Sequence, residues 1–307
     1  MTEIRSCPRF SVVIVAYHRP GDLARLLDAL APTDDSTLTR VVVVNVDDDP
    51  VVRSVAVAHA DVVELSASNL GYAAAVNAGV ALVNDEFVVF MNDDVHVDHT
   101  DLVRLVGRVA CGATDVAVPR LVDEYGDDEG TVRALPTPGR LLVEWALTSD
   151  QPHRHPRSVE KWRRPTAPEA VSAATAALVA VRTDLLREHP LPDAYFLYWE
   201  ELDWFWQLRE TGARVEIVPD VTVKHAGGRE DVRPDKQRLL ARNAVRCVRL
   251  TQGRQAALLA WPIVVAWQAR LVTADAWRCV RSPRARGRFT ARVAGLGAAV
   301  GAWREIA

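Results

Sequence analysis

Short apolar runs alternate with helix-like segments along residues 10–110, and this alternation limits the possible folds more than any other feature of the sequence. Between the runs, apolar residues recur at helical spacing, as do the leucines of residues 23–30. Strands that alternate with helices form βαβ units and a parallel sheet, so we predict an α/β fold. The expected strands are Phe10–Ala16, Arg40–Val46, Val62–Leu65 and Phe87–Met91. The expected helices follow Asp22, cover Val51–His59, run from the turn at Asn69–Tyr72 to Val83, and cover Thr100–Ala110.

The fourth apolar run ends in three polar residues, Asn92, Asp93 and Asp94. Open α/β sheets bind their ligands at the carboxyl ends of the strands, which is where these side chains fall. Two adjacent carboxylates repel each other, and a hard divalent cation that also carries a substrate phosphate relieves that repulsion. The alternative is a solvated turn between a strand and a helix, because Asp and Asn favour turns and caps.

Other polar side chains follow the strands at the same edge of the predicted sheet. They are Tyr17, Arg19, Asn45, Asp47, Asn69 and Asn77, and their chemistry suits a base, a ribose or a diphosphate. The turn after the first strand has a single glycine, Gly21, so it matches neither the dinucleotide fingerprint nor the Walker phosphate loop. Hydride transfer and P-loop phosphoryl transfer are therefore disfavoured.

The second half of the chain contains an aromatic segment rich in acids. We predict a helix over Tyr195–Thr211 that is closed by Gly212, with Glu200, Glu201 and Asp203 within one turn. The neighbouring tryptophans exclude water and raise the pKa of a carboxylate toward the range of a general base, and their flat faces also pack against sugar rings. The alternative is an amphipathic helix with solvated acids and an aromatic core face.

The remaining segments of the second half carry weaker signals. Residues 149–168 have the composition of a loop, and Ala170–Val181 fits either a strand or a buried helix. Two short strands are expected around Pro219, at Val215–Val218 and Val221–His225. His225 is by default a lone histidine with an ordinary hydrogen-bond partner, and a metal ligand is the alternative.

The C-terminal segment is basic although the whole chain has a net charge of −3. Residues 234–307 hold fourteen Lys and Arg against three acids, a net +11, which leaves −14 on the rest. Such a tail suits an anionic surface, phospholipid rather than nucleic acid. Its apolar positions between Leu258 and Leu271 fit an interfacial helix, or a helix that packs on the catalytic domain with a solvated arginine face. The run Ala256–Trp267 is too short to span a bilayer.

The cysteines and the N-terminal residues indicate in which cellular compartment the protein is expected. Four cysteines lie far apart and form no CxxC pair, so neither a zinc site nor a disulfide framework is indicated. The first residues form no apolar signal segment. We expect a cytoplasmic protein. If the basic tail binds phospholipid, it would hold the protein at the inner face of the membrane.

Five motifs, in this order and spacing, resemble the family 2 glycosyltransferases, and within them the bacterial rhamnosyltransferase-like branch. The motifs are Val12–Pro20, Asn69–Gly79, Phe90–Val95, Phe196–Asp203 and His225–Gly228, and Arg242-Asn243 also matches that branch. The resemblance covers residues 10–250. It implies a GT-A fold with a mixed, mainly parallel sheet, a catalytic domain over 1–232 (nucleotide half 8–122, acceptor half 123–232) and a helical extension over 233–307.

The resemblance also implies roles for individual residues in an inverting transfer from a nucleotide-diphosphate sugar, such as dTDP-rhamnose or a UDP-sugar, to a hydroxyl acceptor of cell-surface glycan or metabolite biosynthesis. Asp94 is the expected principal ligand of Mg²⁺ or Mn²⁺, with Asp93 beside it and His225 near the same cation. Glu201 falls at the position of the catalytic base, and Glu200 and Asp203 are the neighbouring candidates. The expected nucleotide-sugar residues are Tyr17, Arg19, Asn45, Asp47, Asn69, Gly71, Asn77 and Asp93.

Some positions depart from the family pattern. Asn45 stands where an Asp commonly contacts the base, Glu201 replaces a shorter Asp, and Gln207 replaces an Arg. Ala173-Ala174 lacks the glycine often seen before the following strand. Two other functions stay open on these grounds: a non-catalytic module that binds a sugar nucleotide or glycan, and a sugar nucleotidyltransferase. The second usually carries a glycine-rich loop after the first strand, which is missing here.

Overall fold

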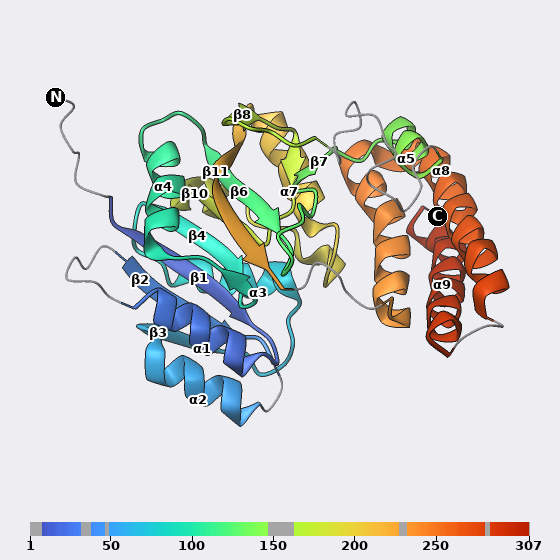
Figure 1. The fold of residues 1–307 in the computed structure, drawn as a ribbon. Coiled ribbons are helices and arrows are strands. Elements are labelled where there is room, and N and C mark those ends of the chain that lie inside the picture. Colours follow the sequence, from blue (N-terminus) through green and yellow to red (C-terminus); the bar gives the residue numbers. More distant parts are fainter. Residues whose placement is uncertain are drawn as a thin grey trace.

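The computed structural model describes residues 8–31, 38–46, 49–146, 163–226, 232–279 and 283–306. In these ranges a sheet flanked by helices forms one part, and the long C-terminal helices lie together at one end of it (Figure 1). The strands of the main sheet are β1 (Phe10–Ala16), β2 (Leu38–Val44), β3 (Val62–Leu65), β4 (Phe87–Asn92), β5 (Val95–His96), β6 (Val116–Val122), β8 (Glu169–Ala170), β10 (Leu178–Arg182) and β11 (Val215–His225).

The order of the main sheet is β3-β2-β1-β4-β10-β6-β11-β5, and β8 pairs with β11. The first four strands run parallel, as the βαβ pattern predicts, and β11 runs parallel to β6. Strand β10 lies antiparallel between β4 and β6, so the sheet is mixed but mainly parallel. Two further short strands, β7 (Val132–Arg133) and β9 (Ala173–Ala174), form a small separate sheet.

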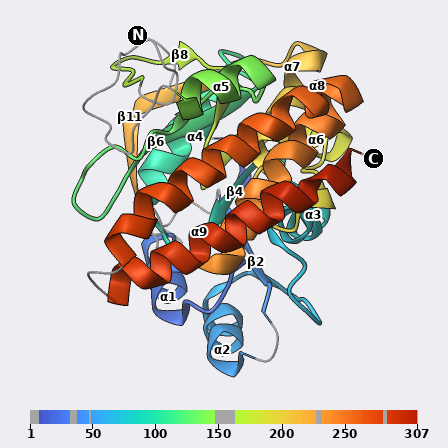
Figure 2. The ribbon, with the colours of Figure 1, turned by 90° about the vertical axis from the view of Figure 1, so that its right-hand side faces the viewer.

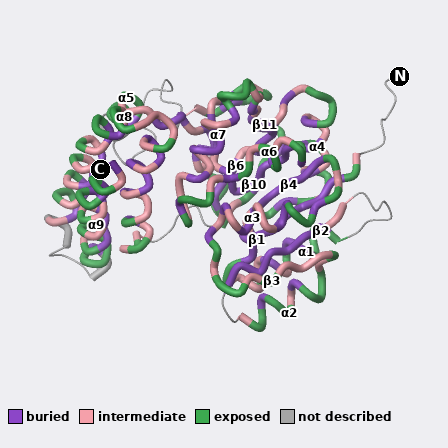
Figure 3. The backbone as a smooth tube through the Cα atoms, turned by 180° about the vertical axis from the view of Figure 1, so that it is seen from behind, coloured by how far each residue is buried: buried purple, intermediate pink, exposed green. Residues whose placement is uncertain are grey.

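Helices cover both faces of the sheet. The helices on the sheet are α1 (Pro20–Ala29), α2 (Pro50–His59), α3 (Tyr72–Ala81), α4 (His99–Ala110), α6 (Thr183–Glu188) and α7 (Glu200–Thr211). Helices α5 (Pro138–Ala146), α8 (Pro234–Cys279) and α9 (Pro283–Gly301) pack on one another, and the 3-10 turns are η3 (Asp193–Tyr195) and η4 (Ala302–Glu305). Helices α1, α2 and α4 pack with alternate strand residues such as Ile14, and α3, α6 and α7 pack with the others, such as Val13. The central strands, such as β1 and β4, are therefore buried on both sides, as Figure 3 shows. Burial of each such side chain contributes about 1.5–3 kcal/mol.

Local sequence sets the ends of several helices. Pro20 and Pro50 occupy the start of α1 and α2, where a missing N–H costs nothing. The side chain of Asp49 accepts hydrogen bonds from the first turn of α2, and Asp98 does the same for α4. Helix α7 ends at Gly212, whose φ of 81° is the left-handed C-cap expected from the sequence.

The structure corrects three expected elements. Helix α7 begins at Glu200 rather than Tyr195, because Phe196, Tyr198 and Trp199 have φ between 67° and 80° and cannot continue a right-handed helix. The two strands expected around Pro219 form one strand, β11, with a shift of register between Val218 and Thr222. The segment Ala170–Val181, left open as strand or helix, contains parts of the three short strands β8, β9 and β10.

The basic C-terminal segment is helical, as expected. Helix α8 changes direction at Gly253, where φ is 86°, and its second half runs alongside α9 (Figure 2). Small residues such as Ala241, Ala257 and Ala299 form a core between these helices, and α5 packs on α8 through Leu141. By length and composition alone, Pro234–Ala276 contains an 18-residue window apolar enough to cross a membrane, of which 28% is buried inside the protein.

Candidate active site

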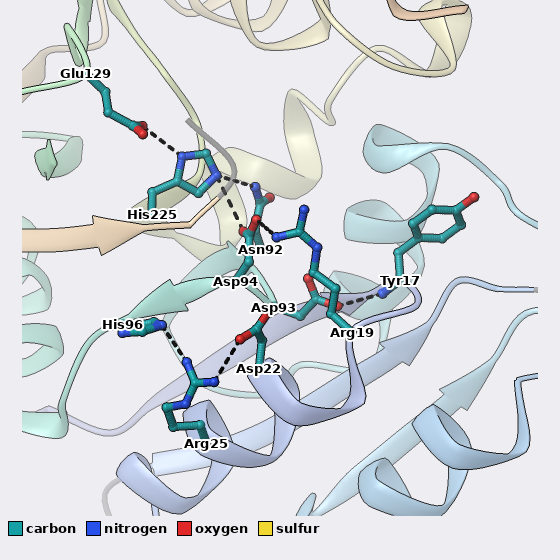
Figure 4. A network of polar contacts seen from close by, with 10 residues as sticks. All are labelled: Tyr17, Arg19, Asp22, Arg25, Asn92, Asp93, Asp94, His96, Glu129 and His225. Carbon is teal, nitrogen blue, oxygen red and sulfur yellow. Dashed lines mark hydrogen bonds and ion pairs between the residues drawn. The ribbon is translucent and has the colours of Figure 1, made fainter. Parts of the chain in front are cut away.

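The adjacent acids Asp93 and Asp94 lie in the turn between β4 and β5, and both are buried. The Asp93 carboxylate accepts a hydrogen bond of 2.7 Å from the backbone N–H of Tyr17, which follows β1. Asp94 Oδ2 lies 2.5 Å from Nη1 of Arg19 (Figure 4). The carboxyl ends of two neighbouring parallel strands therefore bring these four residues together, as predicted.

His225, at the end of β11, approaches the same acids from the other half of the sheet. Its Nε2 lies 3.4 Å from Asp94 Oδ1 and 3.3 Å from the amide nitrogen of Asn92, and its Nδ1 lies 2.9 Å from Glu129 Oε2. His225 is thus part of an acidic constellation and not a lone histidine. Glu129 was not predicted, because it lies in the loop after β6, where neither periodicity nor motif spacing marks it.

Burial and neighbouring charge set the ionisation of this cluster. Burial raises the pKa of Asp93 to about 7, against the hydrogen bond from Tyr17. Burial would also raise the pKa of Asp94, but its contacts with His225 and Arg19 hold it below the ordinary value. Burial opposes a charge on His225, yet the hydrogen bonds with Asp94 and Glu129 raise its pKa to about 9. Asp94 is therefore the ionised member of the acidic pair.

The residues at this edge fit a divalent cation in part. The buried Oδ1 of Asp94 has no hydrogen bond of good geometry and only the ion pair with His225 at 3.4 Å, so it has a lone pair for a cation, and His225 adds an imidazole nitrogen. Carboxylate and imidazole suit Mn²⁺, and carboxylate oxygen suits Mg²⁺. Among the described residues, no three His, Cys, Asp or Glu side chains form a complete metal cage. A cation bound here would take its other ligands from substrate phosphate and water, and it would displace the proton of His225.

The turn before α3 is built by asparagines. The Asn45 side chain donates to Asn69 Oδ1 and Gly71 O, each at 3.2 Å, and accepts from Leu70 N at 2.8 Å. Asn69 Oδ1 also accepts from Gly71 N at 2.9 Å. The two asparagines predicted to contact the nucleotide thus shape this turn, and their amides are engaged within the protein.

Asn77, another predicted nucleotide residue, has different surroundings. Asn77 lies on α3 and bonds through both ends of its amide with the backbone of Leu191, at 2.8 and 3.1 Å. It fixes α3 to the segment before η3. Asp47 lies outside the described residues.

Gly71 is placed where no other residue fits. Its φ is +83°, and a Cβ built on it lies 2.2 Å from Phe196 O. We expect Gly71→Ala to lower the free energy of unfolding by about 2–3 kcal/mol, as measured by denaturant unfolding. Gly112→Ala is the control, because Gly112 has a φ of +73° but open space around it. If both variants lose the same stability, the close approach to Phe196 is not the cause.

The acids of α7 lie in its first turn, where negative charge also interacts favourably with the helix dipole. Glu200 is 4% exposed, and Glu201 is more accessible. Burial and the repulsion from Glu201 raise the pKa of Glu200, and burial raises that of Glu201. Asp203 is different: its carboxylate accepts from Tyr195 Oη at 2.6 Å and Gln207 Nε2 at 3.0 Å, so both oxygens are occupied.

Tyr72 lies within electrostatic range of both acidic pairs. It is the first residue of α3, and its hydroxyl donates to Ala176 O at 3.1 Å. Burial raises its pKa well above the ordinary value. The negative charges that add to this rise are those of Glu200, Glu201, Asp94 and Asp93. One phenol therefore lies within electrostatic reach of the acids of β4 and of α7.

Comparison with known proteins decides the family. The model for Glycosyl transferase family 2 matches residues 11–174, which is more than half of the chain. The chain belongs to this family. A comparison with curated proteins finds no match for this glycosyltransferase.

Solved structures show that the enzyme has the GT-A fold that the resemblance implied. Residues 1–349 of S. aureus TarS give a TM-score of 0.55 at 15% identity, over 96% of this chain and 80% of TarS. The mannosyltransferase PcManGT from Pyrobaculum calidifontis, in complex with GDP-Man and Mn²⁺, gives 0.57 at 17% identity, over 96% and 87%. GalNAc-T7 with UDP, GalNAc and Mn²⁺ gives 0.56 at 16% identity, over 80% and 48%.

Proposed function

We propose that this glycosyltransferase moves a sugar, with inversion, from a nucleoside diphosphate to a hydroxyl acceptor. The observation that carries the proposal is that the backbone N–H of Tyr72 donates to Phe196 O at 3.0 Å, so the segment leading into the α7 acids lies against the turn at the edge of the sheet that holds Asp94. A donor diphosphate at the end of β4 then lies on one side of the anomeric carbon, and an acid of α7 on the other. We propose that the catalytic domain covers residues 1–232 and that residues 233–307 form a separate helical extension.

The donor end of the site is proposed to hold the diphosphate. Asp94 and His225 would bind Mg²⁺ or Mn²⁺, and Asp93 lies beside them. A divalent cation, when bound, supplies positive charge for the departing nucleoside diphosphate. Arg19 has a partly exposed guanidinium at the same edge, so it can move from Asp94 to a phosphate oxygen. Tyr17 and the turn at residues 69–71 border the space for the base and ribose.

We propose that the acceptor end of the site holds the general base of catalysis. Glu201 takes the proton of the acceptor hydroxyl while that oxygen bonds to the anomeric carbon and the bond to the diphosphate breaks. Attack from the face opposite the leaving group inverts the anomeric centre. Glu201 raises the proton affinity of Glu200 by charge repulsion, so Glu200 keeps its proton beside an ionised Glu201, and Asp203 stabilises the start of α7 through Tyr195.

A panel of nucleotide sugars tests the proposal. The enzyme is incubated with Mn²⁺ and dTDP-rhamnose, UDP-hexoses or GDP-mannose, and the release of nucleoside diphosphate is measured with and without glycan acceptors. We expect metal-dependent release with one donor class. Binding without any release would support the non-catalytic module, and release of pyrophosphate from a nucleoside triphosphate and a sugar phosphate would support a nucleotidyltransferase.

The ionisation of the α7 acids predicts a pH dependence. Glu201 must be ionised to act as a base, and burial raises its pKa, so the activity falls as the pH drops through that raised value. The positive charge of Arg133 favours the ionised form of Glu201, and Arg133→Gln removes that charge. We expect the acid limb of the kcat/KM profile to move to higher pH in this variant. An unchanged limb would contradict the assignment of the limb to this pair.

We also propose that the C-terminal helices contact an anionic membrane at the inner face, near a lipid-linked acceptor. Between Arg254 and Arg270, α8 has no charged residue, and Leu258 and Leu259 are 40% and 65% exposed. Exposed apolar side chains with basic residues at both ends are typical of an interfacial helix. The alternative is a helix that packs on the rest of the protein and does not contact a membrane.

Vesicle binding distinguishes the two. We expect the full chain to sediment with phosphatidylglycerol vesicles, and the double variant Leu258→Glu, Leu259→Glu to bind at least about tenfold more weakly. Leu82→Glu is the control, since Leu82 is an exposed leucine at the end of α3. Equal binding of the double variant and the control would contradict membrane contact through α8.

A further inference from the structure

The segment that leads into α7 has an unusual backbone. Phe196, Tyr198 and Trp199 have φ values of 67°, 68° and 80°, and none of them is glycine. Bulky residues rarely adopt this conformation, and they keep it only where surrounding contacts hold it. Because Trp199 directly precedes Glu200, these contacts decide where the acids of α7 point.

Asn243 on α8 supplies most of those contacts. Its side chain is fully buried, and its Nδ2 donates toward Tyr195 O at 3.1 Å, Leu197 O at 2.9 Å and Tyr198 O at 3.1 Å. Three carbonyls of one segment converge on one amide group that comes from a helix some 45 residues further along the chain. A side chain whose only task is to stabilise α8 needs no such convergence.

The donor side of the site holds the same segment from the opposite direction. The backbone N–H of Tyr72 donates to Phe196 O at 3.0 Å, and Gly71 lies directly against that carbonyl. The four consecutive carbonyls of residues 195–198 are therefore all bonded, three to α8 and one to the turn before α3. The segment joins the turn proposed to border the nucleotide to the acids proposed to face the acceptor.

We propose that Asn243 is a positioning residue for catalysis, and that through it the C-terminal extension forms part of the active site. Asn243 holds residues 195–199 in the conformation that aims the first turn of α7 at the donor. This inference rests on the proposed role of Glu201 as the base. The inference also means that the active site, expected within residues 1–232, includes a residue of the extension over 233–307.

The test compares Asn243→Ala with Gln237→Ala in the full chain. Gln237 is a buried amide on the same helix, but its side chain accepts from Arg292 of α9 at 2.8 Å rather than donating to residues 195–199. We expect Asn243→Ala to lower kcat by about 100-fold, as a displaced catalytic group does, while KM for the donor changes less than about threefold. The pH profile of its residual activity should also lose the acid limb assigned to Glu200 and Glu201. Gln237→Ala should keep kcat and the pH profile.

Two results would overturn the inference while transfer by the wild type is intact: kcat of Asn243→Ala within a few-fold of wild type, or an equal loss of kcat in Gln237→Ala. If Asn243→Ala does not fold, Asn243→Ser replaces it, because the shorter hydroxyl keeps a polar group at the site but can donate to at most one of the three carbonyls. The same criteria apply to that variant. If the wild type transfers no sugar, the proposed function has failed, which is a different outcome.

Discussion

Replacing Glu201 with glutamine is expected to lower kcat by about 10²–10⁴-fold, the usual contribution of a general base. The amide keeps the size of the side chain but cannot take the proton of the acceptor hydroxyl. Binding of the nucleotide should change little, because the nucleotide contacts are proposed at the ends of the parallel strands. Steady-state transfer and calorimetric titration with the nucleoside diphosphate measure the two quantities.

Glu210→Gln is the matched control for this experiment. Glu210 lies near the end of the same helix, is exposed, and pairs with Arg209 at 2.7 Å. It should retain wild-type kcat. If Glu201→Gln also retains it, Glu201 is not the base, and a large loss in Glu200→Gln alone would move that role to Glu200.

Replacing Asp94 with asparagine is expected to lower kcat by about 10³-fold and to weaken Mn²⁺ binding by about 10–100-fold. The change removes the ionised carboxylate of the acidic pair while the shape of the turn is kept. It also leaves Arg19 and His225 without their shared anionic partner. Transfer assays give the first effect, and electron paramagnetic resonance of free Mn²⁺ gives the second.

Asp220→Asn controls for the loss of one acidic charge, because Asp220 is an exposed residue of β11. It should leave both quantities unchanged. Wild-type Mn²⁺ affinity in Asp94→Asn would exclude Asp94 as a metal ligand, even if the activity is lost.

Local patterns in the sequence predict the sheet well and the start of α7 poorly. A short run of branched apolar residues such as Phe10–Ala16 buries both faces of a strand when the strand lies inside a parallel sheet covered by helices. The parallel strands of the structure agree with this pattern. The residues before Glu200 have helical composition, yet Phe196, Tyr198 and Trp199 are held in left-handed conformations by groups distant in the chain. A contact across such a separation leaves no periodic signal.

The same limit applies to the site. Asp93, Asp94, Arg19 and His225 meet as the motifs predict, because strand ends fix them at one edge. Asn45 and Asn77 were predicted from their positions to contact the nucleotide, but a motif does not show that their amides are bonded to the backbone at residues 70–71 and 191. Glu129 and Asn243 act from a loop and a late helix, where only the folded chain reveals their partners.

The central claim is that one donor sugar lies between Asp94 and the acids of α7. A crystal structure of the chain with Mn²⁺ and an unreactive nucleotide sugar tests it most directly. We predict that the metal contacts Asp94 and the diphosphate, and that the Glu201 carboxylate faces the anomeric carbon from the side opposite the diphosphate. A donor bound with Glu201 on the side of its leaving group, or away from the end of β4, would contradict the claim.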